Sequence, residues 1–165
     1  MENLTYHVYT DGACSGNKVG EGLGGYAYLI IDKLSERRWI SSGHVKNTTN
    51  NIMELVAVIA ALKTIVKKHH GDTHKISCVV HSDSKYVVDG YTSYLPKWLK
   101  NGWLSSDDRD IANKMYWEVL SAISFFFKSV KFKWIRGHDK DEYNKLVDKL
   151  ANTESQKLKA KCRER

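Results

Sequence analysis

The chain has 165 residues, 42% of them hydrophobic and 27% charged, which are the proportions of a soluble globular protein of one ordinary domain. No apolar run approaches the roughly 20 residues that a membrane-spanning helix needs, and residues 1–10 lack the basic start and apolar middle of a secretory signal, so we expect a cytoplasmic protein without a membrane partner. The formal charge of +7 and the pI near 9.2 favour a polyanionic partner, because each phosphate that a cation neutralises releases counterions.

The first part of the chain predicts a β-meander. Residues 6–9 alternate as a strand does and run into an Asp-Gly pair, and glycines crowd residues 16–25 before a second strand at 26–31. A polar, turn-like segment then precedes a third short strand around residues 38–44. We therefore expect a hairpin followed by a further strand.

A helix and a strand follow. In residues 52–68 the apolar side chains recur at intervals of three and four, the spacing of one buried helical face. Residues 75–80 form a β-branched run that is typical of a buried strand, and a helix can begin within residues 84–90. The order strand, helix, strand, helix is that of β-α units.

The remainder predicts a helix at residues 111–123, a strand at 130–135 and a closing helix at 144–159. The basic end of the chain, from about residue 152 to 165, is expected to fray. A β-meander followed by β-α units predicts an α/β fold with a mixed sheet flanked by helices. We expect residues 1–165 to form one domain, because no repeat or low-complexity linker divides them.

Four acidic side chains are candidates for a shared site. Asp11 and Asp83 each follow an apolar strand, and if these strands are adjacent and parallel, their carboxylates meet where open α/β sheets place their sites. Glu54 lies in the first turn of the long helix and Asp148 in the closing helix, so either can be aimed at the same point. Clustered carboxylates repel one another and lose hydration, and hard cations such as Mg²⁺ or Mn²⁺ neutralise them. Two such ions roughly 4 Å apart can activate water and stabilise the leaving oxygen of a phosphodiester.

Each acid also has a purely structural interpretation. Residues 51–54 match a capping box, Asp83 is placed to cap the helix that follows it, and Asp11 is placed to shape an Asp-Gly turn. Asp148 can be a surface residue. Caps and turns are far commoner than metal sites, so only the joint placement of the four acids favours a site.

Five short motifs, in this order, resemble those of type 1 ribonuclease H: YTDGA at 9–13, TTNNIMEL at 48–55, SDS at 82–84, GH at 137–138 and NKLVD at 144–148. The resemblance extends from about residue 6 to residue 151, nearly the whole chain, and five ordered motifs are more specific than any one of them. It implies the ribonuclease H-like fold, a five-stranded mixed sheet of an antiparallel meander and parallel strands flanked by helices.

The resemblance also implies an activity. Members of the family are endonucleases that hydrolyse the RNA strand of RNA–DNA hybrids and leave 5′-phosphate and 3′-hydroxyl ends. Asp11, Glu54, Asp83 and Asp148 match the family's metal-ligand positions, which implies catalysis by two Mg²⁺ ions in each site, with Mn²⁺ as a substitute. His138 matches the loop histidine that assists proton transfer or product departure, work that suits a neutral imidazole. Without its Gly-His context it would be taken for an exposed loop histidine.

The same resemblance implies contacts with the hybrid. The family reads the minor groove, where RNA displays its 2′-hydroxyls. The residues at groove-contacting positions are Cys14, Asn17, Asn50, Asn51 and Lys85. Lys85 stands where the family often has glutamine. Asn50 and Asn51 have a second interpretation as helix caps.

Two more binding surfaces are implied. The pocket for a phosphate of the DNA strand typically combines arginine, threonine and asparagine; Thr49 and Asn113 match, whereas Asn47 stands at the arginine position, which implies a weaker grip. The residues that resemble the family's basic protrusion, where aromatic faces and cations both contribute, are Lys97, Trp98, Lys100 and Trp103. The alternative for the two tryptophans is that they only pack the protrusion.

Two other functions remain open. A catalytically silent hybrid-binding module can share the fold, since fold does not prove chemistry, although the complete set of acids argues against it. Another nuclease or a strand transferase can share an acidic sheet, but such proteins lack this order of motifs. We expect a monomer whose one domain binds the hybrid.

Overall fold

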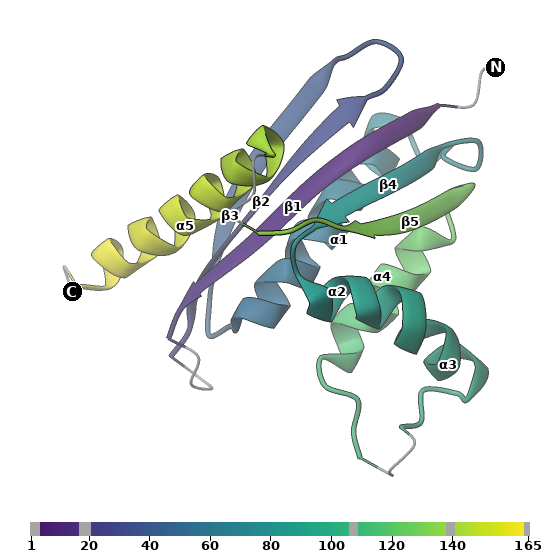
Figure 1. Cartoon of the computed structure of the whole chain (residues 1–165). Helices are drawn as coiled ribbons and strands as arrows, with labels where there is room; N and C mark the ends of the chain where they lie inside the picture. The colour runs from purple at the N-terminus through teal and green to yellow at the C-terminus, as the bar shows by residue number, and fades with distance from the viewer. Residues whose placement is uncertain (1–3, 17–20, 106–108, 138–140, 164–165) are drawn as a thin grey trace.

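Five strands form one mixed sheet in the order β3-β2-β1-β4-β5 (Figure 1). β1 (Thr5–Ser15) pairs antiparallel with β2 (Leu23–Asp32), which pairs antiparallel with β3 (Arg38–Lys46). On its other side β1 pairs in parallel with β4 (Ser77–Ser82), and β4 pairs in parallel with β5 (Ser129–Trp134). The five-stranded mixed sheet expected from the sequence is confirmed.

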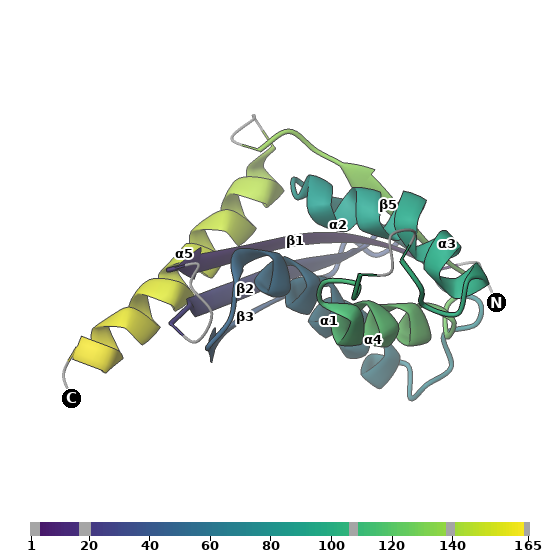
Figure 2. The same ribbon diagram turned by 90° about the horizontal axis from the view of Figure 1, so that it is seen from below.

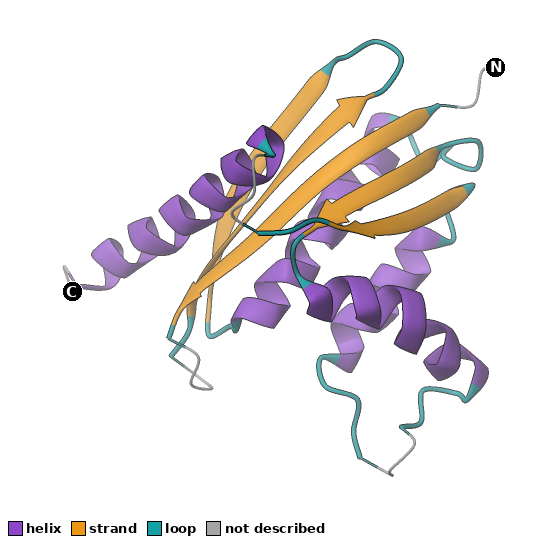
Figure 3. Ribbon diagram, viewed as in Figure 1, coloured by secondary structure: helices purple, strands orange, loops and turns teal. Residues whose placement is uncertain are grey.

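Helices cover both faces of the sheet. The computed structural model describes residues 4–16, 21–105, 109–137 and 141–163. α1 (Asn50–Lys68) and α4 (Lys114–Ser124) lie on one face, and α5 (Glu142–Arg163) runs across β1, β2 and β3 on the other (Figure 2, Figure 3). No helix within these residues is both long and apolar enough to cross a bilayer.

The two faces bury separate apolar cores. Neighbouring residues of a strand point to opposite faces of a sheet. The larger core combines alternate residues of β1 and β2 with the apolar face of α1 and includes Tyr6, Val8, Tyr28, Ile30, Leu55, Val58, Leu62 and Ile65. The smaller core, under α5, consists of Ala13, Ala27, Leu29, Ile31, Val147 and Ala151. The odd-numbered residues of β1 therefore face α5.

α2 (Lys85–Asp89) and α3 (Leu95–Lys100) join through a π-helical turn, η1 (Gly90–Tyr94), into one helical run. The sequence predicts only the first of these segments, as a helix that begins within residues 84–90. Pro96 occupies one of the first positions of α3, where its missing N–H is tolerated. The run thus carries residues 97 and 100 on a helix next to α4 (Figure 1).

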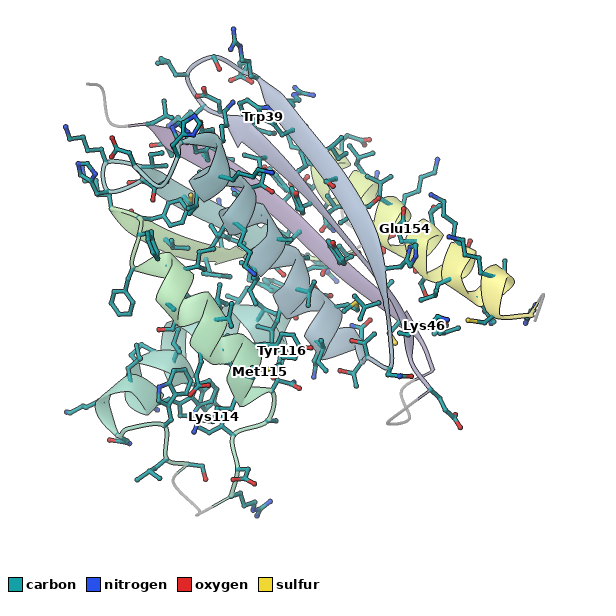
Figure 4. The ribbon with its side chains drawn as sticks, turned by 180° about the vertical axis from the view of Figure 1, so that it is seen from behind. Trp39, Lys46, Lys114, Met115, Tyr116 and Glu154 are labelled. Carbon is teal, nitrogen blue, oxygen red and sulfur yellow. The ribbon has the colours of Figure 1, made fainter. Side chains whose placement is uncertain are left out.

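α5 is longer than the sequence suggests, and residues 152–163, which were expected to fray, are helical. The buried carboxylate of Glu154 ties this part of α5 to β3 (Figure 4): it accepts hydrogen bonds from Nδ1 of His44 at 2.9 Å and from Oγ of Ser42 at 3.0 Å. The hydrogen bond from His44, helped by those from Lys157 and Ser42, lowers the pKa of Glu154 to about 2. These contacts hold the basic end of the helix on the sheet.

Glu154→Gln tests this attachment. Because the folded-state pKa of Glu154, about 2, lies below the ordinary glutamate value of about 4.3, the carboxylate adds stability above that value, and this is lost as the pH falls toward 2. We expect the substitution to lower the free energy of unfolding in urea by about 1–3 kcal/mol at neutral pH, and by less as the pH falls through that window. Glu142→Gln, at an exposed carboxylate of the same helix, should change it by less than about 0.5 kcal/mol. Equal losses from the two substitutions would contradict the attachment.

Candidate active site

The strands that surround the acidic residues end at different points. Pairing of β1 with β4 stops at Tyr9 and His81, whereas β1 continues to Ser15, paired with β2. Asp11 therefore lies inside β1 and not after its end as the sequence suggests, because pairing with β2 extends the strand. In the part of the chain that the structure describes, no strand pairs with the β4 side of β1 beyond Tyr9. Asp11 therefore lies beside a gap in the sheet.

Gly12 lets the first turn of α1 approach the gap. A Cβ on Gly12 would lie 2.4 Å from the backbone nitrogen of Glu54 and 2.5 Å from the carbonyl carbon of Met53. Glycine is the residue that permits so close a contact between a strand and another backbone. The approach brings the carboxyl group of Glu54 into hydrogen-bonding contact with that of Asp11.

Four carboxyl groups meet at this point. One oxygen from each of Asp11, Glu54 and Asp83 lies within 4.8 Å of the others, and Asp148 from α5 reaches the side chain of Asp11. Asp11 and Glu54 are 5% and 4% exposed, and Asp83 and Asp148 are half-buried. Acids from β1, α1, the loop after β4 and α5 thus share one place, as their positions in the sequence suggest.

The environment of these acids opposes their ionisation. Burial, followed by the charges of Asp83 and Asp148, raises the pKa of Asp11 to about 8. Burial and the charges of Asp11 and Asp83 also raise the pKa of Glu54. Both shifts are the response of carboxylates that have lost hydration and face like charges. Protons or cations are needed to neutralise such a group.

The donor set fits a hard divalent cation. The four side chains offer carboxylate oxygens, which are the ligands that Mg²⁺ and Mn²⁺ prefer. Oε2 of Glu54 is buried and, among the described residues, has no hydrogen-bond partner. A buried carboxylate oxygen without a hydrogen-bond partner, among carboxyl groups whose pKa values are raised, is expected where side chains are arranged to bind a metal ion. A donor set of carboxylate oxygens alone suits such hard cations better than zinc, which prefers nitrogen and sulfur ligands.

Other residues take the structural roles that the sequence also allowed for these acids. α1 is capped by Thr49, whose Oγ1 accepts from the backbone N–H of Ile52 at 3.3 Å, so the capping box suggested for residues 51–54 is wrong. α2 is capped by Ser84, whose Oγ accepts from the backbone N–H of Val87 at 3.3 Å, so Asp83 is not the cap. Glu54 and Asp83 are therefore free to serve the cluster.

Sequence reasoning missed two residues that hold Asp83. Nδ2 of Asn144 lies 3.4 Å from Oδ2 of Asp83, and Nε1 of Trp134 donates to the backbone carbonyl of Asp83 at 3.1 Å. A Cβ on Gly137 would lie 2.9 Å from the same Oδ2. Asn144 is the first residue of the NKLVD motif at 144–148, so the sequence offered a signal for its role. Trp134 belongs to none of the five motifs, so the sequence offered none.

The residues predicted to contact the groove lie around the cluster as far as they are described. Asn17, and also His138, lie outside the described residues. Cys14 is half-buried, and its Sγ lies 3.2 Å from the carbonyl oxygen of Gly16. Asn50 and Asn51 are exposed in the first turn of α1 and do not cap it, since Thr49 does. The cap interpretation of these two asparagines is therefore wrong.

The remaining predicted contacts lie at helix starts. Lys85 is the exposed first residue of α2. Asn113 precedes α4 with a left-handed backbone, φ 58°, and its Nδ2 donates to the hydroxyl of Tyr86 at 2.9 Å. Asn47, which stands at the arginine position of the family, is exposed just before Thr49 and also has a positive φ of 55°. Asparagine tolerates this conformation better than arginine does.

The predicted protrusion has an aromatic interior and a basic surface. The ring centroids of Trp98 and Trp103 lie 6.2 Å apart, and Trp98 also packs edge-on against Trp117 at 5.6 Å. Both Trp98 and Trp103 are half-buried against the larger core, which favours the packing role for them. Lys97 and Lys100 are exposed on α3. The cations, rather than the indoles, are therefore placed to meet a ligand.

A family model described as RNase H matches residues 3–156. The ribonuclease H of Neorickettsia sennetsu is 39% identical over 150 residues, which are 91% of this chain and 92% of that protein. The ribonuclease H of Acetivibrio thermocellus is 40% identical over 151 residues, 91% of this chain and 94% of that protein. The chain belongs to the ribonuclease H family. The expectation of a ribonuclease H enzyme is thereby confirmed.

Solved structures support the same family. LC9-RNase H1, a type 1 RNase H with the type 2 active-site motif, matches with a TM-score of 0.81 and 29% identity over 96% of this chain and 75% of its own. LC11-RNase H1, whose crystal structure is a complex with an RNA/DNA hybrid, matches with a TM-score of 0.68 over 92% of this chain and 97% of its own. Its identity of 24% shows the fold alone. The predicted type 1 ribonuclease H fold is confirmed.

Asp11→Asn should stabilise this ribonuclease H when no metal is bound. Because the folded-state pKa of Asp11, about 8, lies above the ordinary aspartate value of about 3.9, the stability of the wild-type protein falls as the pH rises between those values. The substitution removes this loss, so in EDTA the free energy of unfolding should rise by on the order of a few kcal/mol near pH 8 and by little near pH 4. Thermal unfolding at both pH values measures the gain.

Asp72→Asn, at an exposed carboxylate paired with His74, is the control and should show no such gain. Added Mn²⁺ should raise the unfolding temperature of the wild-type protein more than that of Asp11→Asn, since a ligand stabilises the state that binds it. A gain from Asp11→Asn that is the same at both pH values would contradict the raised pKa.

Proposed function

We propose that this ribonuclease H is an endonuclease that hydrolyses the RNA strand of RNA–DNA hybrids. The proposal depends above all on the buried cluster of Asp11, Glu54 and Asp83 in a protein of net charge +7. An acidic centre in a basic protein suits a nuclease, because surface cations hold the phosphate backbone while the centre engages one phosphate. The family, and the hybrid bound in the similar LC11-RNase H1, support the choice of substrate.

In the proposed mechanism Asp11, Glu54, Asp83 and Asp148 hold two Mg²⁺ ions, for which Mn²⁺ can substitute. When bound, such a pair of ions supplies an activated water and stabilises the leaving oxygen of an in-line displacement. The four carboxylates must lose their protons to bind, so binding is favoured as the pH rises. His138 assists proton transfer or product departure. The products carry 5′-phosphate and 3′-hydroxyl ends.

The substrate contacts form three groups. The minor groove of the hybrid is read by Cys14, Asn17, Asn50, Asn51 and Lys85. A phosphate of the DNA strand is held by Thr49 and Asn113. The outer backbone is held by the protrusion, where Lys97 and Lys100 supply the charge on the surface and Trp98 and Trp103 pack beneath it. We also propose that residues 1–165 act as one domain, as a monomer in the cytoplasm.

Cleavage of defined substrates tests the activity. With Mg²⁺, the wild-type protein should cut the RNA of a labelled hybrid and leave duplex DNA and duplex RNA intact, as followed on denaturing gels. Asp11→Asn should lower the rate by about a thousandfold or more, because it removes a shared metal ligand, and should bind the hybrid as tightly as the wild type in EDTA. Asp72→Asn should cut at the wild-type rate. An active Asp11→Asn protein would exclude the metal mechanism.

The protrusion is tested by salt dependence. Lys97→Ala and Lys100→Ala should each weaken hybrid binding at low salt, and each should flatten the slope of log affinity against log salt by up to about 0.9, the value for one neutralised phosphate. Lys33→Ala, at an exposed lysine between β2 and β3, should change neither quantity. Fluorescence anisotropy in EDTA measures both. Unchanged affinity of both variants at every salt concentration would remove the protrusion from the binding surface.

A further inference from the structure

Trp134, the last residue of β5, connects two neighbours of the active site. Its Nε1–H donates to the backbone carbonyl of Asp83 at 3.1 Å, and the Nζ of Lys85 lies 5.1 Å from the centroid of its ring. A cation within about 6 Å of an indole face is attracted to it. The side chain of Trp134 therefore interacts both with a member of the carboxylate cluster and with the exposed cation of Lys85.

Packing does not account for the position of Trp134. Its side chain is 44% exposed, and it belongs to neither of the two apolar cores formed by the described residues, whereas Val130 and Phe132 of the same strand pack against the larger one. The exposed indole of Trp134 is held by a hydrogen bond and by a cation–π contact. We therefore attribute its position to these two contacts and not to packing in an apolar core.

The surroundings of Lys85 indicate what it can bind. Among the described residues no carboxylate forms an ion pair with its ammonium group, and its side chain is exposed. An ammonium group donates hydrogen bonds and accepts none, so it suits an anion. Contact with the indole restricts a flexible side chain in advance and lowers the entropy that binding would otherwise remove.

We propose that Trp134 is a positioning residue with two actions: it fixes Asp83 within the carboxylate cluster, and it holds the ammonium group of Lys85 where it binds a backbone phosphate next to the one that is cut. This inference rests on the proposed function, since it assumes a nucleic-acid substrate at the cluster. It replaces the minor-groove contact that the family resemblance implies for Lys85 with a phosphate contact, and Trp134 determines where the charge of Lys85 lies.

Three substitutions separate the two actions. Lys85→Gln removes the charge and leaves Asp83 untouched. Trp134→Phe keeps an aromatic face for Lys85 but removes the N–H donor to Asp83. Trp134→Leu removes both. Another lysine–tryptophan pair, Lys68 over Trp39 at 4.0 Å, provides matched controls. It lies at the opposite end of α1 from Glu54, and Figure 4 shows Trp39 at the end of β3 remote from Lys46.

Hybrid binding in EDTA tests the action on Lys85 without metal or cleavage. Lys85→Gln and Trp134→Leu should each weaken binding about three- to tenfold at low salt and flatten the salt slope by about 0.9. The double variant should bind no more weakly than Lys85→Gln alone, because both changes remove one contact. Losses that multiply in the double variant, or wild-type affinity of Trp134→Leu, would overturn this half of the proposal.

Mn²⁺ binding by calorimetry, without substrate, tests the action on Asp83. Trp134→Phe and Trp134→Leu should weaken it about tenfold, the lower end of what is lost when a partner of a metal ligand is removed, and Lys85→Gln should leave it unchanged. Wild-type Mn²⁺ affinity of Trp134→Phe would overturn this half.

Trp39→Phe and Lys68→Gln should match the wild type in both experiments. If the proposed function itself fails, the wild-type protein will either not bind the hybrid or bind it without cutting its RNA in Mg²⁺. Both outcomes concern the wild-type protein alone, which distinguishes them from a failure of these variants.

Discussion

The mutual repulsion of buried carboxylates is the constraint on which the rest of this structure depends. Asp11 and Glu54 are almost fully buried, contact each other and face Asp83, so their pKa values are raised. A buried charge without a partner costs several kcal/mol or shifts to its neutral form. The rest of the fold therefore has to hold these carboxyl groups together although they repel one another. A cation bound among them would offset that repulsion.

Contacts made by residues outside the cluster hold the carboxyl groups in place. Gly12 lacks the side chain that would separate α1 from β1 and so keeps Glu54 beside Asp11. Glu154 ties α5 to β3, which fixes the helix that carries Asp148. Nδ2 of Asn152 in turn lies 2.9 Å from Oδ1 of Asp148. These acids are thus placed by contacts with residues outside the cluster, which is how a preorganised site is built.

The sequence predicts the elements and the membership of the cluster, because periodicity reports buried faces and ordered motifs report the family. It does not predict that β1 continues past Asp11, that Pro96 lies within a helical run, or that the closing helix, expected at residues 144–159, extends to Arg163. These three differences have one cause: each depends on a partner distant in the sequence, such as β2 for β1 and His44 for α5. The contact of Trp134 with Asp83 is of the same kind. Local patterns do not record such contacts.

The location of the acids also indicates the class of substrate. A hollow of about 350 Å³ lined by Tyr91, Leu95 and other residues, and one of about 310 Å³ that includes Trp117, contain none of the four carboxylates. The acids lie instead at a gap in the sheet, with Lys85 exposed beside them. Enzymes of small molecules enclose their ligands in cavities, whereas a polymer is bound across a surface by many phosphate contacts around a few reacting atoms. The half-buried carboxylates of Asp83 and Asp148, with the exposed Lys85 next to Asp83 in a protein of net charge +7, therefore favour an extended anionic substrate.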